Sequence, residues 1–200
     1  MLQIKAIQFN VQNPFTWASG WKSPIYCDNR ILLSYPEVRN FVKNQLTQIV
    51  KDNFSTVNCI AGVATAGIPH ASLVADILEL PLVYVRDKPK GHGMKNTIEG
   101  RLPEKPKVVV IEDVISTGKS SLKAVEDLKE AQAEIIGMAA IYTYEFDIAK
   151  ERFEEHQVKL ATITRYSELV KVAAQTGYVS PDNLTTLQDW RKNPAEWSIK

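Results

Sequence analysis

The chain has 200 residues, the size of one domain or of one domain with a small appendage. Hydrophobic residues make up 44% and charged residues 24%, proportions typical of a globular protein that can bury a core. With 24 basic and 23 acidic side chains the net charge is only +1, so the sequence lacks the basic excess of a nucleic-acid-binding protein.

The sequence offers no disulfide framework and no segment for export or membrane insertion. Cys27 and Cys59 are the only cysteines, and they do not form a CxxC pair. No N-terminal stretch resembles a signal peptide, and no segment approaches the roughly 18 apolar residues that span a bilayer. We therefore expect a cytoplasmic protein with no membrane partner.

The first part of the chain, Met1 to about Asn29, is rich in aromatic residues and turn formers and shows no regular period. We expect a small lobe over residues 1–34, with part of the C-terminal region packing on it, and a main domain over residues 35–200. A helix is predicted to begin near Pro36, because proline suits a first helical turn and apolar residues follow at helical spacing. These residues are Val38, Phe41, Val42, Leu46, Ile49 and Val50.

Strand-like and helix-like segments then alternate along the chain. The strand-like runs are 57–64, 82–85, 107–111, 134–142 and 158–163, and helical stretches lie at 71–78, 122–131 and 150–156. A last helix is predicted after Ser180-Pro181-Asp182, packed on the domain or on a partner chain. The alternation predicts an α/β fold with a parallel sheet, and ligands of such sheets bind outside the carboxyl ends of the strands.

The most informative segment runs from Val108 to Ser121 and reads VVVIEDVISTGKSS. A buried strand is predicted to end in two carboxylates, Glu112 and Asp113, before a short turn rich in hydroxyls and glycine and the start of a helix. Backbone N–H groups of such a turn, with the positive end of the helix, form a cradle for an anion. An acidic pair beside that cradle suits a ligand with hydroxyls at one end and a phosphate at the other, such as a ribose phosphate.

Two other interpretations of this segment are weaker. The fragment Gly118-Lys119-Ser120 ends like a nucleotide-triphosphatase phosphate loop, but that motif needs a glycine where this chain has Asp113. The second interpretation is a charged strand end followed by a helix cap, without any ligand.

Residues 86–107 form a basic segment with interleaved glycines. It holds seven basic and three acidic side chains, a net charge of +4. A segment with so few apolar residues is expected to be a mobile loop. Beside a phosphate cradle it could close, exclude water and neutralise a departing pyrophosphate. The alternatives are a merely solvated loop or a nucleic-acid patch.

Residues 108–121 resemble the phosphoribosyl-pyrophosphate signature of the type I phosphoribosyltransferases: four hydrophobic residues, two acids and a small-residue turn. The resemblance implies a parallel-sheet core flanked by helices, a small N-terminal hood lobe and a mobile basic loop. It implies that Glu112 and Asp113 engage the ribose 2′ and 3′ hydroxyls. Contacts around the 5′-phosphate are expected from Val114, Ile115, Ser116, Thr117, Gly118, Lys119 and Ser120.

Residues 84–100, YVRDKPKGHGMKNTIEG, resemble the loop of orotate phosphoribosyltransferases. By that match Arg86, Lys90 and His92 contact the pyrophosphate, typically from the neighbouring subunit of a dimer. Many members carry a lysine directly after the arginine, where this chain has Asp87 and then Lys88, so the residue for that role stays open. The expected catalytic residues are Lys90, His92 and Asp113.

Residues 15–30, FTWASGWKSPIYCDNR, also resemble the orotate enzymes and separate them from purine-specific relatives. The lobe caps the base in that family, so Tyr26 would wall the pyrimidine, with Lys22, Ser23 and Arg30 nearby. Orotate is a flat anion, which suits an aromatic wall and polar contacts. The alternative is a turn-rich packing segment.

Residues 62–69, GVATAGIP, match the family's pyrophosphate loop, with Thr65 and Ala66 as expected contacts. Some members carry a lysine where this chain has Ala66 or Ala18, and an arginine that touches the base where it has Tyr144 and Glu145. The pyrophosphate contacts are therefore expected to depend more on backbone N–H groups.

The resemblance implies a homodimeric enzyme with shared active sites that converts orotate and 5-phosphoribosyl-1-pyrophosphate to orotidine monophosphate and pyrophosphate. It implies Mg²⁺ carried by the pyrophosphate donor, with no direct metal ligand from the protein. Two alternatives remain: a transferase of the same fold for another base, and a nucleic-acid-binding pyrimidine regulator, which the balanced charge opposes.

Overall fold

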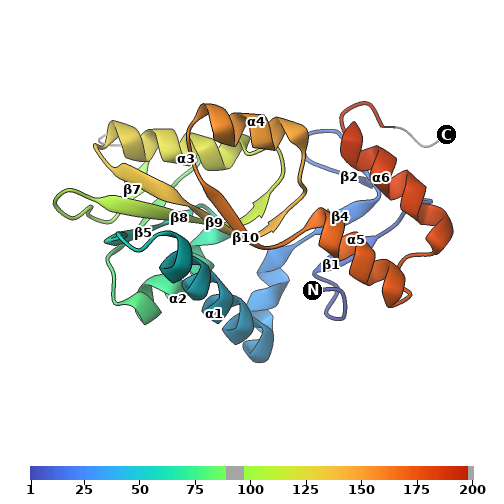
Figure 1. Ribbon diagram of the computed structural model, residues 1–200, viewed down its shortest axis with the longest axis horizontal. Coiled ribbons are helices and arrows are strands. Elements are labelled where there is room, and N and C mark those ends of the chain that lie inside the picture. The colour runs from blue at the N-terminus through green and yellow to red at the C-terminus, as the bar shows by residue number, and fades with distance from the viewer. Residues whose placement is uncertain (89–96, 198–200) are drawn as a thin grey trace.

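A computed structural model describes residues 1–88 and 97–197. At its centre is a six-stranded sheet with the strand order β10-β9-β8-β5-β6-β7 (Figure 1). The strands are β5 (Cys59–Val63), β6 (Leu82–Val85), β7 (Ile98–Glu99), β8 (Lys107–Ile115), β9 (Glu134–Thr143) and β10 (Leu160–Arg165). All neighbours are parallel except β7, which pairs antiparallel with β6.

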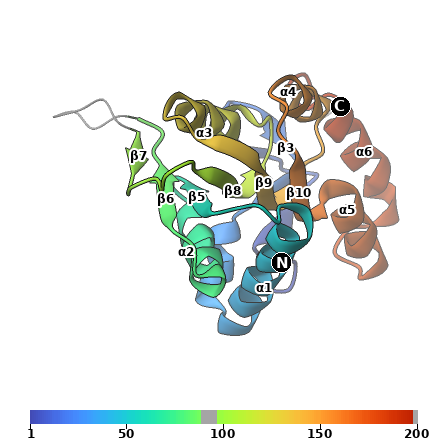
Figure 2. The ribbon, with the colours of Figure 1, turned by 60° about the vertical axis from the view of Figure 1, so that its left-hand side comes forward.

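Helices cover both faces of this sheet (Figures 1 and 2). One face carries α1 (Pro36–Asn53) and α2 (Gly67–Leu78), and the other carries α3 (Lys119–Glu130) and α4 (Asp147–Glu155). The central strand β8 is buried on both sides, because successive strand residues alternate between the two faces. Val108 and Val110 belong to the apolar cluster under α3 and α4, and Val109 and Ile111 belong to the cluster under α1 and α2.

The N-terminal lobe consists of two small antiparallel sheets and a 3-10 helix. In it β1 (Ile7–Phe9) pairs with β4 (Ile25–Cys27), β2 (Phe15–Thr16) pairs with β3 (Lys22–Ser23), and η1 (Asn29–Ser34) follows. The C-terminal elements are α5 (Tyr166–Gln175), η2 (Pro181–Asn183) and α6 (Leu184–Lys192). These C-terminal elements lie beside β1 and β4, at the β10 end of the main sheet (Figure 1).

Aromatic side chains join the lobe to the C-terminal helices. The ring of Trp17 lies 4.9 Å from that of Tyr144 and 5.7 Å from that of Trp190. The indole N–H of Trp190 donates to the carbonyl of Lys22 at 3.0 Å. The division into residues 1–34 and 35–200 remains a proposal, since Ile7 belongs to the same apolar cluster as the core of the main sheet.

The predicted α/β fold with a mostly parallel sheet and flanking helices is confirmed, with four local differences. Strand β8 continues to Ile115, so the two acids lie inside the strand. Residues 98–99 of the basic segment form β7, and residues 166–175 form a helix that the pattern did not indicate. Phe41, grouped with the apolar stripe of α1, is 59% exposed, because its position falls outside the buried face.

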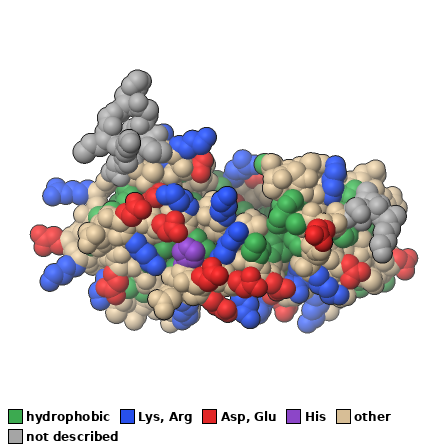
Figure 3. All heavy atoms as spheres, turned by 90° about the horizontal axis from the view of Figure 1, so that it is seen from above, with side chains coloured by type: hydrophobic (Ala, Val, Ile, Leu, Met, Phe, Trp, Pro, Cys, Tyr) green, Lys and Arg blue, Asp and Glu red, His purple; other side chains and the backbone are tan. Residues whose placement is uncertain are grey.

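No helix among residues 1–88 and 97–197 is long and apolar enough to cross a membrane. On the face formed by α3 and α4, acidic and basic side chains are interspersed (Figure 3).

Candidate active site

The carboxyl ends of the parallel strands bring several sequence-predicted segments to one edge of the sheet. A small cleft there is lined by the end of β5, by the residues after β6 and by the first turn of α3. Ala64, Arg86 and Ser120, distant in sequence, share this cleft. Thr65 and Ala66 follow Ala64 directly, and the peptide bond between Ala64 and Thr65 is cis. Residues 62–69 (the predicted pyrophosphate loop), Arg86 and the start of α3, which follows residues 114–118 (the predicted phosphate turn), are thus neighbours at the edge where ligands of parallel sheets bind.

The acidic pair is buried at this edge. Glu112 faces α3, where its Oε2 accepts a hydrogen bond from the Ser121 hydroxyl at 2.9 Å. Its Oε1 accepts the backbone N–H of Asp113 at 3.0 Å. Asp113 is the next strand residue, and the two carboxyl groups also share a side-chain hydrogen bond. Hydrogen bonds within the protein therefore reach both members of the pair.

Burial perturbs both carboxyl groups. It raises the pKa of Glu112 well above its ordinary value, and the negative charge of Asp113 adds to the rise. Burial also raises the pKa of Asp113, although hydrogen bonds and the positive charge of Arg30 oppose it. Two buried carboxylates side by side are costly to ionise together. A ligand that offers hydroxyl donors, or a cation, would relieve that cost.

The cost of ionising the buried pair is expected to lower the free energy of unfolding at high pH. Folding raises the pKa of Glu112 above 4.5, the ordinary value that it has in the unfolded chain. Between these two pKa values the folded protein therefore loses stability as the pH rises. Glu112→Gln keeps an acceptor for the Asp113 N–H and a donor for the Ser121 hydroxyl, and it removes the charge. At pH 8 it should raise Tm by about 2–4 °C, which corresponds to about 1 kcal/mol in a chain of this size.

Thermal unfolding between pH 4 and pH 8 tests this expectation. The gain in Tm should disappear toward pH 4, and a gain that is the same at every pH would contradict the argument. Glu130→Gln, an exposed change at the end of α3, controls for the general loss of one negative charge.

The turn after the acidic pair leads straight into α3. Gly118 has a φ of +73°, a left-handed conformation that suits glycine, and a Cβ there would lie 3.0 Å from the ring of Phe153. The described chain supplies no side-chain cap to the first turn of α3, and Lys119 and Ser120 are exposed. The N–H groups at this helix end can therefore receive an anion.

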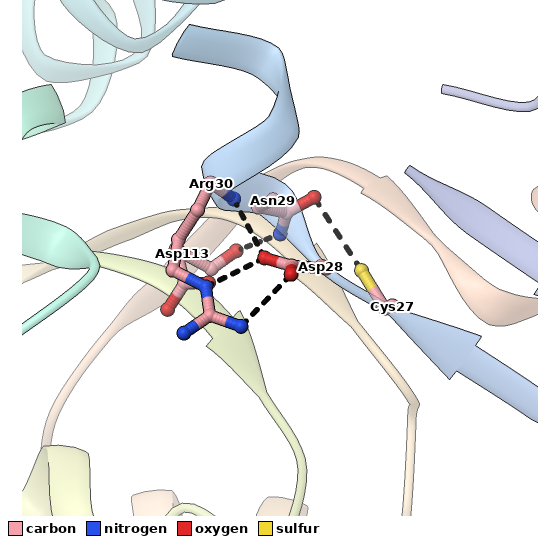
Figure 4. Close-up of polar contacts among 5 residues, drawn as sticks. All are labelled: Cys27, Asp28, Asn29, Arg30 and Asp113. Atoms are coloured by element: carbon pink, nitrogen blue, oxygen red, sulfur yellow. Dashed lines mark hydrogen bonds and ion pairs between the residues drawn. The ribbon is translucent and has the colours of Figure 1, made fainter. Parts of the chain in front are cut away.

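The lobe brings the cationic side chain of Arg30 close to Asp113 (Figure 4), and it also carries the aromatic ring of Tyr26. Tyr26 is 37% exposed, with its ring 5.5 Å from that of Phe15. Arg30 makes a two-point ion pair with Asp28, at 2.7 Å from Nε and 2.8 Å from Nη2. The Arg30 guanidinium holds the pKa of Asp28 below its usual range, and its positive charge also acts on the Asp113 carboxyl.

Lys22, expected near the base, bonds within the lobe instead. Its ammonium group donates to the Thr16 hydroxyl at 2.7 Å, along the β2–β3 pair. The side chain is exposed. The structure therefore shows it beside Thr16, and its contact with a base stays a prediction.

The basic segment is only partly described. Arg86 pairs with Glu99 at 3.3 Å across the β6–β7 hairpin, and its N–H donates to the carbonyl of Thr97 at 2.8 Å. Asp87 lines the same cleft as Arg86, and Lys88 is exposed. The predicted contacts Lys90 and His92 lie outside the described residues. The expectation of a loop throughout 86–107 was wrong for residues 98–99, because they pair with β6; Lys107 begins β8, as the strand-like run 107–111 predicted.

A larger hollow of about 650 Å³ lies elsewhere, between α4, the start of β10 and α6. It is lined by charged and apolar side chains such as Lys150, Phe153 and Arg191. It contains none of the acidic pair, the phosphate turn or the pyrophosphate loop. Volume alone does not make it the reaction site.

Comparison with known proteins identifies the family. The model of the phosphoribosyl transferase domain matches residues 32–179. An orotate phosphoribosyltransferase of Bacteroides thetaiotaomicron is 56% identical over 197 residues, which cover 98% of this chain and 93% of that protein. The chain belongs to the orotate phosphoribosyltransferase family. It is therefore an enzyme of the pentosyltransferase class.

Solved structures agree with this family assignment. The orotate phosphoribosyltransferase of Aeropyrum pernix is 27% identical with a TM-score of 0.77, over 90% of this chain and 97% of that one. The UMP synthase of Leishmania donovani has a TM-score of 0.79 over 95% of this chain, which spans only 40% of that longer protein. At 24% identity the second likeness shows the fold alone.

Two departures from the family pattern have a structural explanation. Tyr144 stands where some family members carry an arginine, and its buried ring stacks on Phe146 at 5.4 Å within the aromatic cluster. Glu145 accepts the N–H of Ser167 at 2.8 Å, and its carbonyl accepts from Arg191 at 2.6 Å. Both positions hold the C-terminal helices in place here.

Two residues that support the site carried no signal in the sequence. Arg152 of α4 donates to the carbonyl of Thr117 at 2.9 Å and so steadies the phosphate turn. Asn29 of η1 donates to the carbonyl of Asp113 at 2.7 Å. Each contact joins residues far apart in the chain, and no local pattern predicts such a pair.

Proposed function

We propose that this enzyme transfers the phosphoribosyl group of 5-phosphoribosyl-1-pyrophosphate to orotate, forming orotidine monophosphate and pyrophosphate. The observation that carries the proposal is the continuous strand, turn and helix of residues 108–121. It places a buried acidic pair one short turn before an uncapped helix start, beside the lobe that carries Tyr26. The name shared by the relatives at more than 50% identity supports orotate as the base.

The reaction breaks one bond at C1′ of the ribose and forms another. The bond from C1′ to the pyrophosphate oxygen breaks, and its electron pair leaves with pyrophosphate. A ring nitrogen of orotate bonds to C1′ and gives up its proton. Positive charge develops on the ribose in between, so the protein contributes positioning and charge stabilisation and needs no covalent nucleophile.

The residues divide into four groups in this proposal. Asp113 and Glu112 hold the ribose hydroxyls, and residues 114–120 hold the 5′-phosphate. Tyr26 covers the base, with Lys22 nearby. The pyrophosphate contacts are Thr65, Ala66, Arg86, Lys88, Lys90 and His92, with Lys90 and His92 stabilising the departing charge.

We propose that Mg²⁺ enters with the donor. Among the described residues no three His, Cys, Asp or Glu side chains lie together so as to hold a metal ion. In this proposal the donor's pyrophosphate and ribose oxygens hold the ion, and the negative charges of Glu112 and Asp113 suit a nearby cation without being its direct ligands. Such an ion would neutralise part of the pyrophosphate charge.

We also propose a homodimer with shared active sites and a cytoplasmic location. The resemblance of residues 84–100 to a loop that reaches a neighbouring subunit supports the dimer. Cys27 and Cys59 are both free thiols, which supports a reducing compartment. The mixed charges of the α3–α4 face give no support to nucleic-acid binding.

Loss of orotate absorbance tests the proposed function directly. The protein is mixed with orotate, the phosphoribosyl donor and Mg²⁺, and each component is omitted in turn. Loss that requires all three components is the expected result. Absence of loss, with donor binding still seen by calorimetry, would contradict orotate as the base and keep the donor site.

A further inference from the structure

Asn29 is a fully buried amide at the boundary between the lobe and the acidic strand. Its exposed fraction is 0%, and its Nδ2 donates to the backbone carbonyl of Asp113 at 2.7 Å, across 84 positions in the chain. Figure 4 shows the amide turned toward the peptide of Asp113, away from the carboxylate. The bond therefore fixes the backbone of the residue that the proposed function places on the ribose.

Cys27 determines which way this amide points. Its thiol lies 3.4 Å from Oδ1 of Asn29. Burial, followed by the negative charges of Asp113 and Asp28, raises the pKa of the Cys27 thiol, so it keeps its proton and can donate. With Oδ1 accepting from sulfur, Nδ2 is the atom left to donate to the carbonyl.

The backbone of Asn29 is also held in place. The Asp28 carboxylate accepts the N–H of Arg30 at 3.1 Å and so begins η1. The N–H of Asp28 donates to the carbonyl of Ala6 at 2.8 Å, which ties the segment to the start of β1. The amide therefore projects from a segment that is anchored on both sides.

The Asn29 hydrogen bond connects the lobe that is proposed to cover the base with the strand that is proposed to hold the ribose. Tyr26 lies three residues before Asn29, in β4, and Asp113 lies in β8. A bond between a ring nitrogen of the base and C1′ requires the base and the ribose to meet at a fixed separation. A misplacement of about 1 Å can cost about a hundredfold in rate.

We propose that Asn29 is a positioning residue, which holds the base-capping lobe in register with the ribose-binding strand. The inference rests on the proposed function. The inference goes beyond the proposed function because it names a residue, remote from the reacting atoms, that sets the distance between the two substrates.

Kinetics of Asn29→Leu test the proposal, because leucine fills a similar volume and cannot donate. We expect kcat with orotate to fall about 10- to 100-fold. The dissociation constant of the phosphoribosyl donor, measured by calorimetry, should rise less than kcat falls, because Glu112 and residues 114–120, which hold the rest of the donor in the proposed function, keep their own contacts. Asn29→Asp is the second variant: its carboxyl can donate to the Asp113 carbonyl only when protonated, so its kcat relative to wild type should rise as the pH falls.

Tyr166→Phe is the matched control. It removes one buried hydrogen bond, from the Tyr166 hydroxyl to the carbonyl of Leu187 at 2.8 Å, between α5 and α6. It should lower Tm as a lost buried bond does and leave kcat unchanged.

The outcomes separate the two proposals. If Asn29→Leu leaves kcat unchanged while wild type converts orotate, the positioning role is overturned and the proposed function stands. If donor affinity falls as far as kcat, the role is structural only and the inference is again overturned. A wild-type protein that does not convert orotate overturns both.

Discussion

Replacing Asp113 with asparagine is expected to lower kcat with orotate by about a hundredfold. Asparagine has the size of aspartate, and the backbone carbonyl that receives Asn29 is unchanged. The loss is of charge alone: a carboxylate binds ribose hydroxyls more strongly than an amide does, and it opposes the positive charge that develops on the ribose. Steady-state kinetics with both substrates give the measurement.

The stability of the same variant separates chemistry from folding. Burial raises the pKa of Asp113, so its ionised form is costly in the folded protein, and Asp113→Asn should not lower Tm at pH 8. Asp182→Asn, an exposed change in η2, is the control with the same chemistry outside the site. Unchanged turnover in Asp113→Asn would remove Asp113 from the mechanism.

Mixing two inactive variants is expected to restore activity if the active site is shared between subunits. Lys90→Ala changes a residue of the basic segment that the proposal places on the pyrophosphate, and Asp113→Asn changes a residue of β8 that it places on the ribose. Random pairing makes about half of the dimers mixed, each with one intact site, so about a quarter of wild-type activity should return. The rate is measured after the two variants are unfolded and refolded together.

A second mixture controls for other causes of recovery. Glu112→Gln and Asp113→Asn change neighbours on one strand, so no site in their mixed dimers is intact. No activity should return there. Absence of recovery in the first mixture as well would show that each chain builds its site alone.

The local structure of residues 108–121 could be predicted from the sequence because its parts are contiguous. Residues 108–121 form one strand, one turn and one helix start, so their order in the chain is their order in space. The strand end was misplaced, since two adjacent acids look like the end of a buried strand. In the structure Ser121 and the Asp113 N–H satisfy Glu112, and β8 continues through the pair.

The support of the site could not be predicted, because it depends on contacts between distant residues. Asn29 reaches β8 and Arg152 reaches the turn before α3, each from another element. Neither residue differs in type or spacing from an ordinary polar residue of a loop or a charged helix. Only the packing of the lobe and of α4 against the sheet brings them to the site.

The aromatic cluster that joins Trp17, Tyr144 and Trp190 makes the position of the lobe depend on distant parts of the chain. The three rings come from the lobe, from the residue after β9 and from α6, whereas residues 107–121 form one contiguous strand, turn and helix start. A substitution that displaces α6 would therefore shift the lobe and leave residues 107–121 in place. Under the proposed function, such a substitution should affect the base more than the ribose phosphate.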